Sequence, residues 1–253
     1  MKVSYRIVIP ARMASQRLPG KPLLDIAGRT LIEHVFRRAC QSSAAQVVIA
    51  TDDRKIFESA RDFGAEVVMT SADHESGSDR IAECADQMGW SDHQLIVNLQ
   101  GDEPLLPPAC LDQVASLLQS DPGADVASLF WPLDNSEEIA DPNVVKAVVA
   151  ESGRALYFSR SVVPFPRHWG DTQNALEAGI IWNRHIGLYA YRAGALRAFA
   201  AMAPTPLESA EKLEQLRFLE SGRHISMARA CEFIPAGVDT PADLERVRQV
   251  IDG

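Results

Sequence analysis

Short runs of valine, isoleucine and leucine alternate with stretches of helical spacing in the first hundred residues, and this alternation constrains the fold most. Strands that are apolar on both faces and alternate with helices are typical of a parallel sheet covered on both sides. We therefore predict a βαβαβαβ unit whose strand-ending loops share one rim, where such sheets bind ligands. The predicted strands are Arg6–Pro10, Gln46–Thr51, Glu66–Met69 and Gln94–Leu99, and the predicted helices are Thr30–Cys40, Arg54–Phe63 and Asp79–Met88.

The second half of the chain is less regular. Val144–Ala150 and Arg154–Phe158 flank a turn with a glycine, which indicates a hairpin, and the polar, proline-broken stretch Pro164–Arg184 is predicted to be a loop. Thr240, Pro241 and Asp243 form an N-cap pattern that indicates a helix start. We predict a strand at Ile186–Tyr191, a helix at Leu207–Gly222 and a last helix at Pro241–Ile251.

The charge balance excludes some partners. Lys and Arg number 25 and Asp and Glu 34, a net charge of −9, which argues against nucleic acid but allows a small anion in a local basic pocket. No apolar run approaches the ~18 residues of a membrane helix, so we expect no membrane partner. The four cysteines lie too far apart for CxxC spacing and indicate free thiols, so we expect a soluble, cytoplasmic protein.

The loop after the first predicted strand is basic. The segment PARMASQRLPGKPL (10–23) places Arg12, Arg17 and Lys21 within ten residues. Backbone amides and cations at the end of a strand suit a phosphate, although the loop has neither the GxxxxGK[ST] nor the GxGxxG pattern. A solvated basic loop is the alternative, and the position after the first strand favours phosphate binding.

Three further segments carry polar groups. Asp102 in NLQGDEP and Asp239 in GVDTP are isolated acids, a pattern that suits a single Mg²⁺ beside substrate phosphates. A surface turn at Asp102 and a plain helix start at Asp239 are the alternatives. The segment HESGSDR (74–80) could read a base edge through hydroxyl and backbone groups, and it could equally be the N-cap of the next helix.

Together, these segments resemble the 3-deoxy-manno-octulosonate cytidylyltransferase (CMP-Kdo synthetase) family over about residues 5 to 250. The sugar-side segments ALYFSR, RHIGLYAYR and LEQLR are the specific ones, whereas the first motif is shared with other sugar nucleotidyltransferases. The sequence departs from the family at Ser78, where Thr is common, at DTPADL in place of DTPEDL, and over Val163–Asn183, which matches poorly. The motifs are PARMASQRLPGKPL, ATDD, HESGSDR, NLQGDEP, ALYFSR, RHIGLYAYR, LEQLR and GVDTPADLERV.

The resemblance implies a single Rossmann-like α/β domain of the nucleotide-diphospho-sugar transferase fold with a mostly parallel central sheet. It implies the Mg²⁺-dependent reaction of CTP with 3-deoxy-D-manno-octulosonate (Kdo) to give CMP-Kdo and pyrophosphate for lipopolysaccharide biosynthesis, in a homodimer. Residues 1–130 would mainly bind CTP, 131–235 would mainly bind the sugar and form the dimer, and 236–253 would carry a metal ligand and a helix.

The resemblance also assigns residues. Arg12 and Lys21 would hold the CTP phosphates, and Asp102 and Asp239 would hold Mg²⁺; these four form the catalytic set. The other expected contacts are Gly77, Ser78, Arg80 and Gln100 for the nucleotide, and Gln100, Arg160, His185, Tyr189, Glu214 and Gln215 for the sugar.

Other functions fit less well. CMP transfer to another acidic sugar, 8-amino-Kdo or sialic acid, is the alternative within enzymes. A non-catalytic CTP-binding protein would be expected to lack Lys21, Asp102 or Asp239, and all three are present. The missing GxGxxG and GxSxG patterns argue against a nicotinamide dehydrogenase and a serine acyl transferase.

Overall fold

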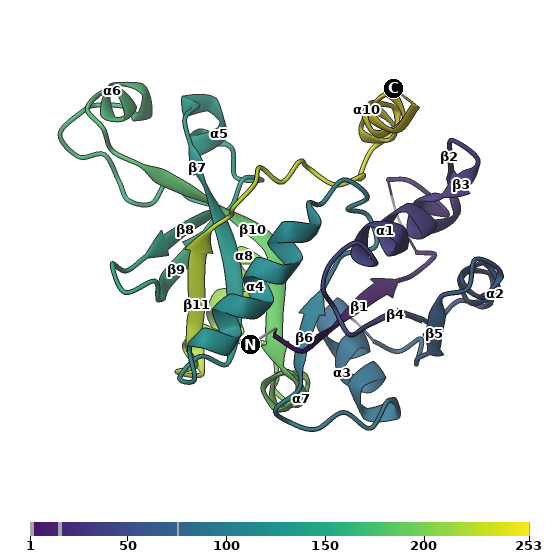
Figure 1. Cartoon of the computed structure of the whole chain (residues 1–253). Helices are drawn as coiled ribbons and strands as arrows, with labels where there is room; N and C mark the ends of the chain where they lie inside the picture. Colours follow the sequence, from purple (N-terminus) through teal and green to yellow (C-terminus); the bar gives the residue numbers. More distant parts are fainter. Residues whose placement is uncertain (1–2, 15–16, 75, 253) are drawn as a thin grey trace.

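The computed structural model describes residues 3–14, 17–74 and 76–252; Ser15, Gln16 and Glu75 of the motifs above lie outside these ranges. Within them a nine-stranded sheet has a main path β11-β7-β10-β6-β1-β4-β5, and β8 and β9 extend it from β10 (Figure 1). A separate two-stranded ribbon, β2 (Asp25–Ile26) with β3 (Arg29–Thr30), follows the first loop. The prediction of one α/β domain with a mostly parallel sheet is confirmed.

The N-terminal half of the sheet is parallel, as predicted. Strand β1 pairs in parallel with β4 and β6, and β4 pairs in parallel with β5. The carboxyl ends of these strands therefore share one edge. Their bounds are Tyr5–Ala11 (β1), Gln46–Thr51 (β4), Glu66–Met69 (β5) and Leu95–Asn98 (β6).

The other half mixes directions. Strand β10 is antiparallel to β6, β7 and β8, whereas β11 is parallel to β7. The predicted hairpin is confirmed, because β8 and β9 pair in antiparallel fashion. The sequence reading did not identify β7 or β11. The bounds are Val126–Leu133 (β7), Lys146–Val149 (β8), Ala155–Ser159 (β9), Trp182–Arg192 (β10) and Ile225–Arg229 (β11).

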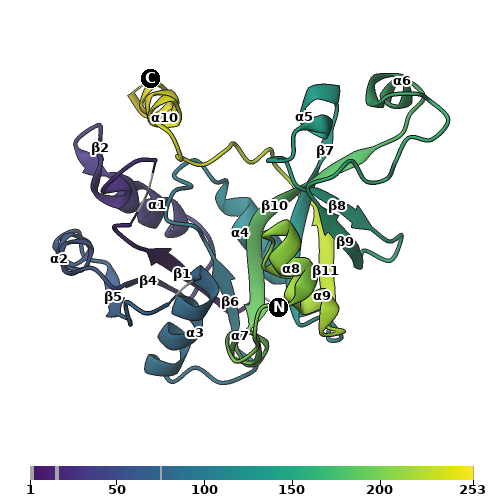
Figure 2. The same cartoon turned by 180° about the vertical axis from the view of Figure 1, so that it is seen from behind.

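Helices cover both faces of the sheet. Ile7 and Ile9 of β1 pack into one core with residues of α1, α2 and α4, and Val8 packs on the opposite face with residues of α3, α7 and α9. Figure 2 shows the second layer from its own side. The bounds are η1 Lys21–Leu23, α1 Leu31–Ala39, α2 Arg54–Asp62, α3 Gly77–Gln87, α4 Pro108–Ser120, α5 Ser136–Ala140, α6 Thr172–Glu177, α7 Ala193–Ala200, α8 Pro206–Glu211, α9 Gln215–Glu220 and α10 Pro241–Asp252.

Two predicted elements were wrong. The stretch 164–184 is not a plain loop, because it contains α6 and the start of β10; Trp182 is buried there in a small cluster with Ala175 and Leu133. The predicted helix Leu207–Gly222 is two helices, since Lys212 adopts the left-handed conformation with φ 53°. A lysine gives no sequence signal for that conformation, which favours Gly and Asn.

In the described part of the chain, no helix combines the length and the apolar character needed to cross a lipid bilayer.

Candidate active site

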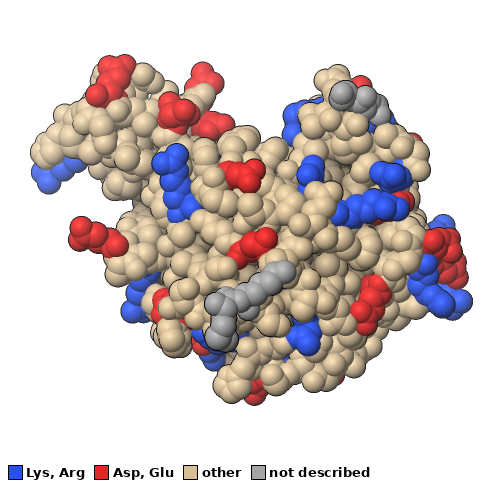
Figure 3. Space-filling view, viewed as in Figure 1, with Lys and Arg blue, Asp and Glu red and all other residues tan. Residues whose placement is uncertain are grey.

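The molecule is hollowed at its upper edge, between the part that carries α5 and α6 and the part that carries α10 (Figure 3). A cavity of about 670 Å³ lies where β1 and β6 end and α3 begins. It is lined by residues of the first loop, the start of α3, the turn after β6 and the loop before α10. The lining residues are Pro10, Ala11, Arg12, Ala14, Arg17, Lys21, Pro22, His74, Ser76, Gly77, Arg80, Gln100, Gly101, Asp102 and Asp239.

Lys21 and the two isolated acids meet in this cavity. The Lys21 Nζ atom lies 2.7 Å from Asp102 Oδ2 and 3.0 Å from Asp239 Oδ1. Burial works against the ammonium, but the two carboxylates outweigh it and raise the pKa of Lys21 above its ordinary value. The structure thus brings together three predicted residues that lie 81 and 218 positions apart in the sequence.

Two glycines allow the acidic turns to approach their neighbours. A Cβ at Gly101 would lie 2.9 Å from the Pro10 carbonyl oxygen, and one at Gly237 would lie 2.9 Å from the Asp102 carbonyl oxygen. The Val238 amide donates to that same Asp102 oxygen at 2.8 Å. Only glycine permits these close backbone contacts, which hold the two carboxylates beside each other.

The donor set fits one kind of metal site. Asp102 and Asp239 come from different loops, and one oxygen of each contacts the Lys21 ammonium. Two such carboxylates are enough to hold Mg²⁺, which completes its coordination shell with waters and substrate phosphates. Within the described ranges, no group of three or more His, Cys, Asp or Glu side chains could hold a metal ion.

Glu103 lies near Asp102 and Asp239 but takes no part in their contacts with Lys21. Its Oε2 atom is buried and has no hydrogen-bond partner among the described residues. Burial, with Asp102 second, raises the pKa of Glu103 to about 8. At neutral pH this side chain is largely protonated, so the local negative charge comes from Asp102 and Asp239.

The start of α3 forms one wall of the cavity. Ser76 and Asp79 make a capping box, as one of the two readings of HESGSDR expected. The Arg80 guanidinium is only 3% exposed and donates to Asp52 Oδ2 at 2.8 Å and to Thr70. Arg80 therefore ties α3 to the loops after β4 and β5, while Gly77 main chain faces the cavity.

A second cavity of about 300 Å³ adjoins the first, and Gly77 and Gln100 line both. Tyr189, Tyr191, Phe199 and Phe218 form an aromatic wall, with Tyr191 and Phe218 centroids 6.0 Å apart. The other lining residues are Ser78, Asn98, Gly187, Lys212, Leu213, Glu214 and Gln215.

Polar groups of the second cavity are partly unpaired. Gln215 is 6% exposed, and its Nε2 atom has no hydrogen-bond partner among the described residues. The Ser78 hydroxyl donates to Glu214 Oε2 at 3.0 Å, which joins α3 to α9 across 136 positions. A buried amide without a partner is costly unless a ligand satisfies it, so Gln215 favours a polar ligand here.

A bulge in β10 orients His185 and Tyr189. The pairing of β10 with β7 shifts between Ile186 and Tyr189. The Ser128 hydroxyl compensates, because it lies 2.9 Å and 3.0 Å from the carbonyl oxygens of Ile186 and Leu188. Its oxygen lies 3.2 Å from His185 Nε2, and the His185 ring packs against Tyr189 with centroids 5.4 Å apart.

His185 should make the stability of the protein depend on pH. Burial, and next the nearby Arg184, lowers the pKa of His185 to about 3, against about 6.5 in an unfolded chain. The unfolded state therefore binds a proton below pH 6.5 that the folded state does not, so stability is complete above pH 6.5 and falls as the pH drops toward 3. We expect the free energy of unfolding to fall from pH 7 to pH 5 by about 1–2 kcal/mol more than in His185→Gln.

Urea denaturation of both proteins at the two pH values measures this difference. Equal pH dependence of the wild type and His185→Gln would contradict the assignment of an imidazole that stays neutral in the folded protein.

Arg160 is not brought into either cavity. Lys212 is the one cation among the described residues that line the second cavity. The Arg160 guanidinium donates to the main-chain oxygens of Glu211 and Pro142 at 2.7 Å and 2.9 Å. The sequence reading did not single out Lys212, which stands in no motif; only the structure shows that it lines the second cavity. Arg17, read from the sequence as part of the basic loop, lines the first cavity.

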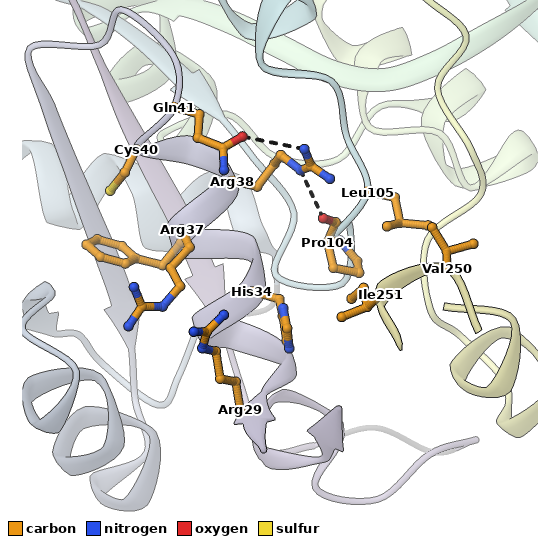
Figure 4. Close-up of a pocket in the computed structure, with 11 residues that line it drawn as sticks. Arg29, His34, Arg37, Arg38, Cys40, Gln41, Pro104, Leu105, Val250 and Ile251 are labelled. Carbon is orange, nitrogen blue, oxygen red and sulfur yellow. Dashed lines mark hydrogen bonds between the residues drawn. The ribbon is translucent and has the colours of Figure 1, made fainter. Parts of the chain in front are cut away.

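A third cavity, of about 650 Å³, lies away from the strand ends between α1, the turn at Pro104 and Leu105, and the end of α10 (Figure 4). Arg38 donates there to Gln41 and to the Pro104 carbonyl oxygen, both at 3.4 Å. Arg29 and Arg37 both contact Glu33. None of the predicted site residues lines this cavity.

The sequence and the fold were compared with known proteins. The model of a cytidylyltransferase family matches residues 6–225. Curated relatives from Pseudomonas syringae pv. syringae (49% identical over 254 residues, 100% of both chains) and Thioalkalivibrio sulfidiphilus (51% over 251 residues, 98% of this chain and 99% of the other) are both 3-deoxy-manno-octulosonate cytidylyltransferases. This chain belongs to that family of cytidylyltransferases.

Solved structures agree with this membership. A CMP:2-keto-3-deoxy-manno-octonic acid synthetase complexed with CTP has a TM-score of 0.89 and 40% identity, with 98% of each chain covered. A 4-diphosphocytidyl-2C-methyl-D-erythritol synthase, 15% identical over the whole of both chains with a TM-score of 0.63, shares the fold alone. The resemblance inferred from the sequence motifs is thereby confirmed.

Proposed function

We propose that this protein transfers the cytidylyl group of CTP to Kdo, releasing pyrophosphate and forming the CMP-Kdo used in lipopolysaccharide assembly. The observation that carries the proposal is the joint position of Lys21, Asp102 and Asp239 in a cavity that opens onto a second, aromatic-walled one. The first cavity has room and cations for a triphosphate, and the second has room and hydrogen-bonding groups for a sugar acid.

In this mechanism the anomeric hydroxyl oxygen of Kdo attacks the α-phosphorus of CTP. The new O–P bond replaces the bond to pyrophosphate, and the hydroxyl proton leaves to water. Both substrates are anions, so cations must offset their repulsion before they meet. Arg12, Arg17 and Lys21 supply positive charge beside the phosphates. No covalent enzyme intermediate is needed, and positioning accounts for most of the rate.

Asp102 and Asp239 would hold Mg²⁺, which would neutralise charge on the phosphates and lower the pKa of the attacking hydroxyl. The main chain at Gly77 would face the nucleotide, and Arg80 would fix that wall rather than reach the base. Ser78 lines the second cavity instead, where its hydroxyl donates to Glu214. Gln100 would contact both substrates, because it lines both cavities.

The sugar would lie against Tyr189, with Glu214 and Gln215 bonding its hydroxyls. His185 would support Tyr189 from behind as a neutral ring. Arg160 keeps its predicted role at the sugar only if its bonds to Glu211 and Pro142 open.

Pyrophosphate release with CTP, Mg²⁺ and one of three acidic sugars tests the proposal. We expect release with Kdo and little with sialic acid. The 8-amino derivative of Kdo remains the second candidate, because it differs by a single substituent. Release with sialic acid alone, or with no sugar of the three, would contradict the proposal.

Lys212 provides a prediction about the sugar side. As the one cation that lines the second cavity within the described chain, it should pair with the sugar carboxylate. A charge-assisted hydrogen bond contributes about 1.5–3 kcal/mol, so Lys212→Met should raise KM for the sugar by about tenfold or more and leave KM for CTP nearly unchanged.

Lys55→Met, at an exposed position of α2, removes the same charge elsewhere and should change neither constant. If Arg160→Met raised the KM for the sugar and Lys212→Met did not, the contact with the sugar carboxylate would be assigned to Arg160.

The homodimer and the division of the chain at about residues 130 and 235 remain predictions from the family resemblance. The cytoplasmic location remains a prediction from the cysteine pattern, and the Mg²⁺ requirement remains one from the two isolated acids and the resemblance together.

A further inference from the structure

Two cysteines far apart in the sequence meet beside α4. Cys110 lies in the first turn of α4, and Cys231 follows β11, 121 positions later. Their Sγ atoms are 3.7 Å apart. No other pair of cysteines within the described ranges shows a sulfur contact; Cys40 is exposed and Cys84 is buried.

The backbone around this pair is held in place. Gln113 of α4 accepts from the Cys231 amide at 2.8 Å and donates to the Arg229 carbonyl oxygen at 2.7 Å. The segment after β11 therefore runs across α4 on its way to α10 (Figure 1). Because Gln113 holds the segment against α4, the two sulfurs lie close together without any rearrangement of the fold.

The position of the pair relates it to the acidic residues of the first cavity. Cys110 follows Asp102 by eight residues, and Cys231 precedes Asp239 by eight. The two segments meet again at the cavity, where the Val238 amide donates to the Asp102 carbonyl oxygen. A bond between the sulfurs would join the two segments that carry these carboxylates at a second point.

We propose that Cys110 and Cys231 form an intramolecular disulfide when the protein meets a peroxide, and that this bond restrains the segments leading to Asp102 and Asp239. Cys231 is exposed and reacts first, whereas Cys110 is fully buried. The inference does not depend on which sugar the enzyme uses.

The chemistry balances with hydrogen peroxide as the oxidant. The Cys231 sulfur attacks the O–O bond, which gives a sulfenic acid and one water. The Cys110 sulfur then attacks the sulfenic sulfur; the S–S bond forms, the S–O bond breaks, and a second water leaves. Two thiols lose two electrons and two protons, and the peroxide becomes two waters.

Two features of the pair determine how fast the disulfide forms and how far the sulfur atoms must move. Burial raises the pKa of Cys110 to about 12, so the second step is slow at neutral pH. The sulfur separation must shorten from 3.7 Å to about 2.05 Å, which the exposed segment at Cys231 can supply.

Peroxide treatment of the full chain, followed by alkylation and non-reducing peptide mapping, tests the pair. We expect one linked peptide that joins Cys110 to Cys231, a loss of two alkylatable thiols, and full reversal by dithiothreitol. Cys40→Ser should behave like the wild type, and Cys231→Ser should give no linked peptide. Oxidation that yields only sulfinic acid at Cys231, or only intermolecular dimers through Cys40, would overturn the proposal.

Two measurements that need no substrate test the restraint. A bond that closes a long loop raises the midpoint of thermal unfolding, here by about 5 °C, in the wild type and not in Cys231→Ser. Amides of residues 230–239 should exchange at least about threefold more slowly in the oxidised protein. Unchanged exchange and an unchanged midpoint in protein with the verified bond would overturn the claim that the bond restrains these segments.

Discussion

Replacing Asp102 with asparagine is expected to lower the turnover of pyrophosphate release by at least about 100-fold and to leave the fold intact. Even outer partners of a metal ligand cost about 10–100-fold when removed, and a direct ligand should cost more. The Asp102 side chain is 29% exposed, so the change buries no new polar group.

Asp62→Asn is a matched control, because Asp62 is an exposed residue of α2 outside the cavities. It makes the same change in charge and should keep normal turnover. Circular dichroism and the unfolding midpoint check the fold of both variants. Near-normal turnover of Asp102→Asn at ordinary Mg²⁺ would contradict the role of this carboxylate.

The second large effect concerns stability. Replacing Arg217 with methionine is expected to lower the free energy of unfolding by about 3–5 kcal/mol, because it leaves the buried Glu208 carboxylate without its partner. The guanidinium donates to Glu208 at 2.7 Å and 2.5 Å, donates to the Met202 carbonyl oxygen at 3.1 Å, and lies 4.1 Å over the Phe199 ring. The unfolding midpoint should fall by roughly 10 °C.

A double-mutant cycle with Glu208→Gln identifies the cause. Because the glutamine carries no charge, Arg217→Met should cost less in that background than in the wild type. Equal costs in both backgrounds would mean that lost packing on Phe199, and not the unpaired carboxylate, accounts for the change. Urea denaturation at pH 7 measures all four proteins.

Local sequence patterns were enough to predict half of the fold. The runs at β1, β4 and β6 are apolar on both faces, so their burial and parallel direction could be read directly. The parallel direction of β5 could be read too, but β5 lies at the sheet edge with Glu66 and Met69 exposed. The last helix could also be read, because Thr240 and Asp243 form the predicted cap with hydrogen bonds at 2.9 Å and 3.2 Å. These features depend on residues within a few positions of each other.

Other elements depend on contacts between distant residues. Strand β11 pairs with β7 about a hundred positions earlier, and neither partner has a distinctive pattern on its own. The break at Lys212 depends on how α8 and α9 pack, and Leu213 and Leu216 would suit one continuous helix equally well. The spacing of apolar residues therefore could not distinguish one helix from two.

The sequence by itself determined the residue types of the site and the family, because motifs such as PARMASQRLPGKPL and LEQLR are local strings. Only the tertiary structure decided which of those residues share a space. It placed Lys21 between Asp102 and Asp239, brought Lys212 to the second cavity and bound Arg160 to main-chain oxygens instead. The physical reason is that cavities and ion pairs arise where loops from distant segments converge at one sheet edge, and residue spacing carries no record of that convergence.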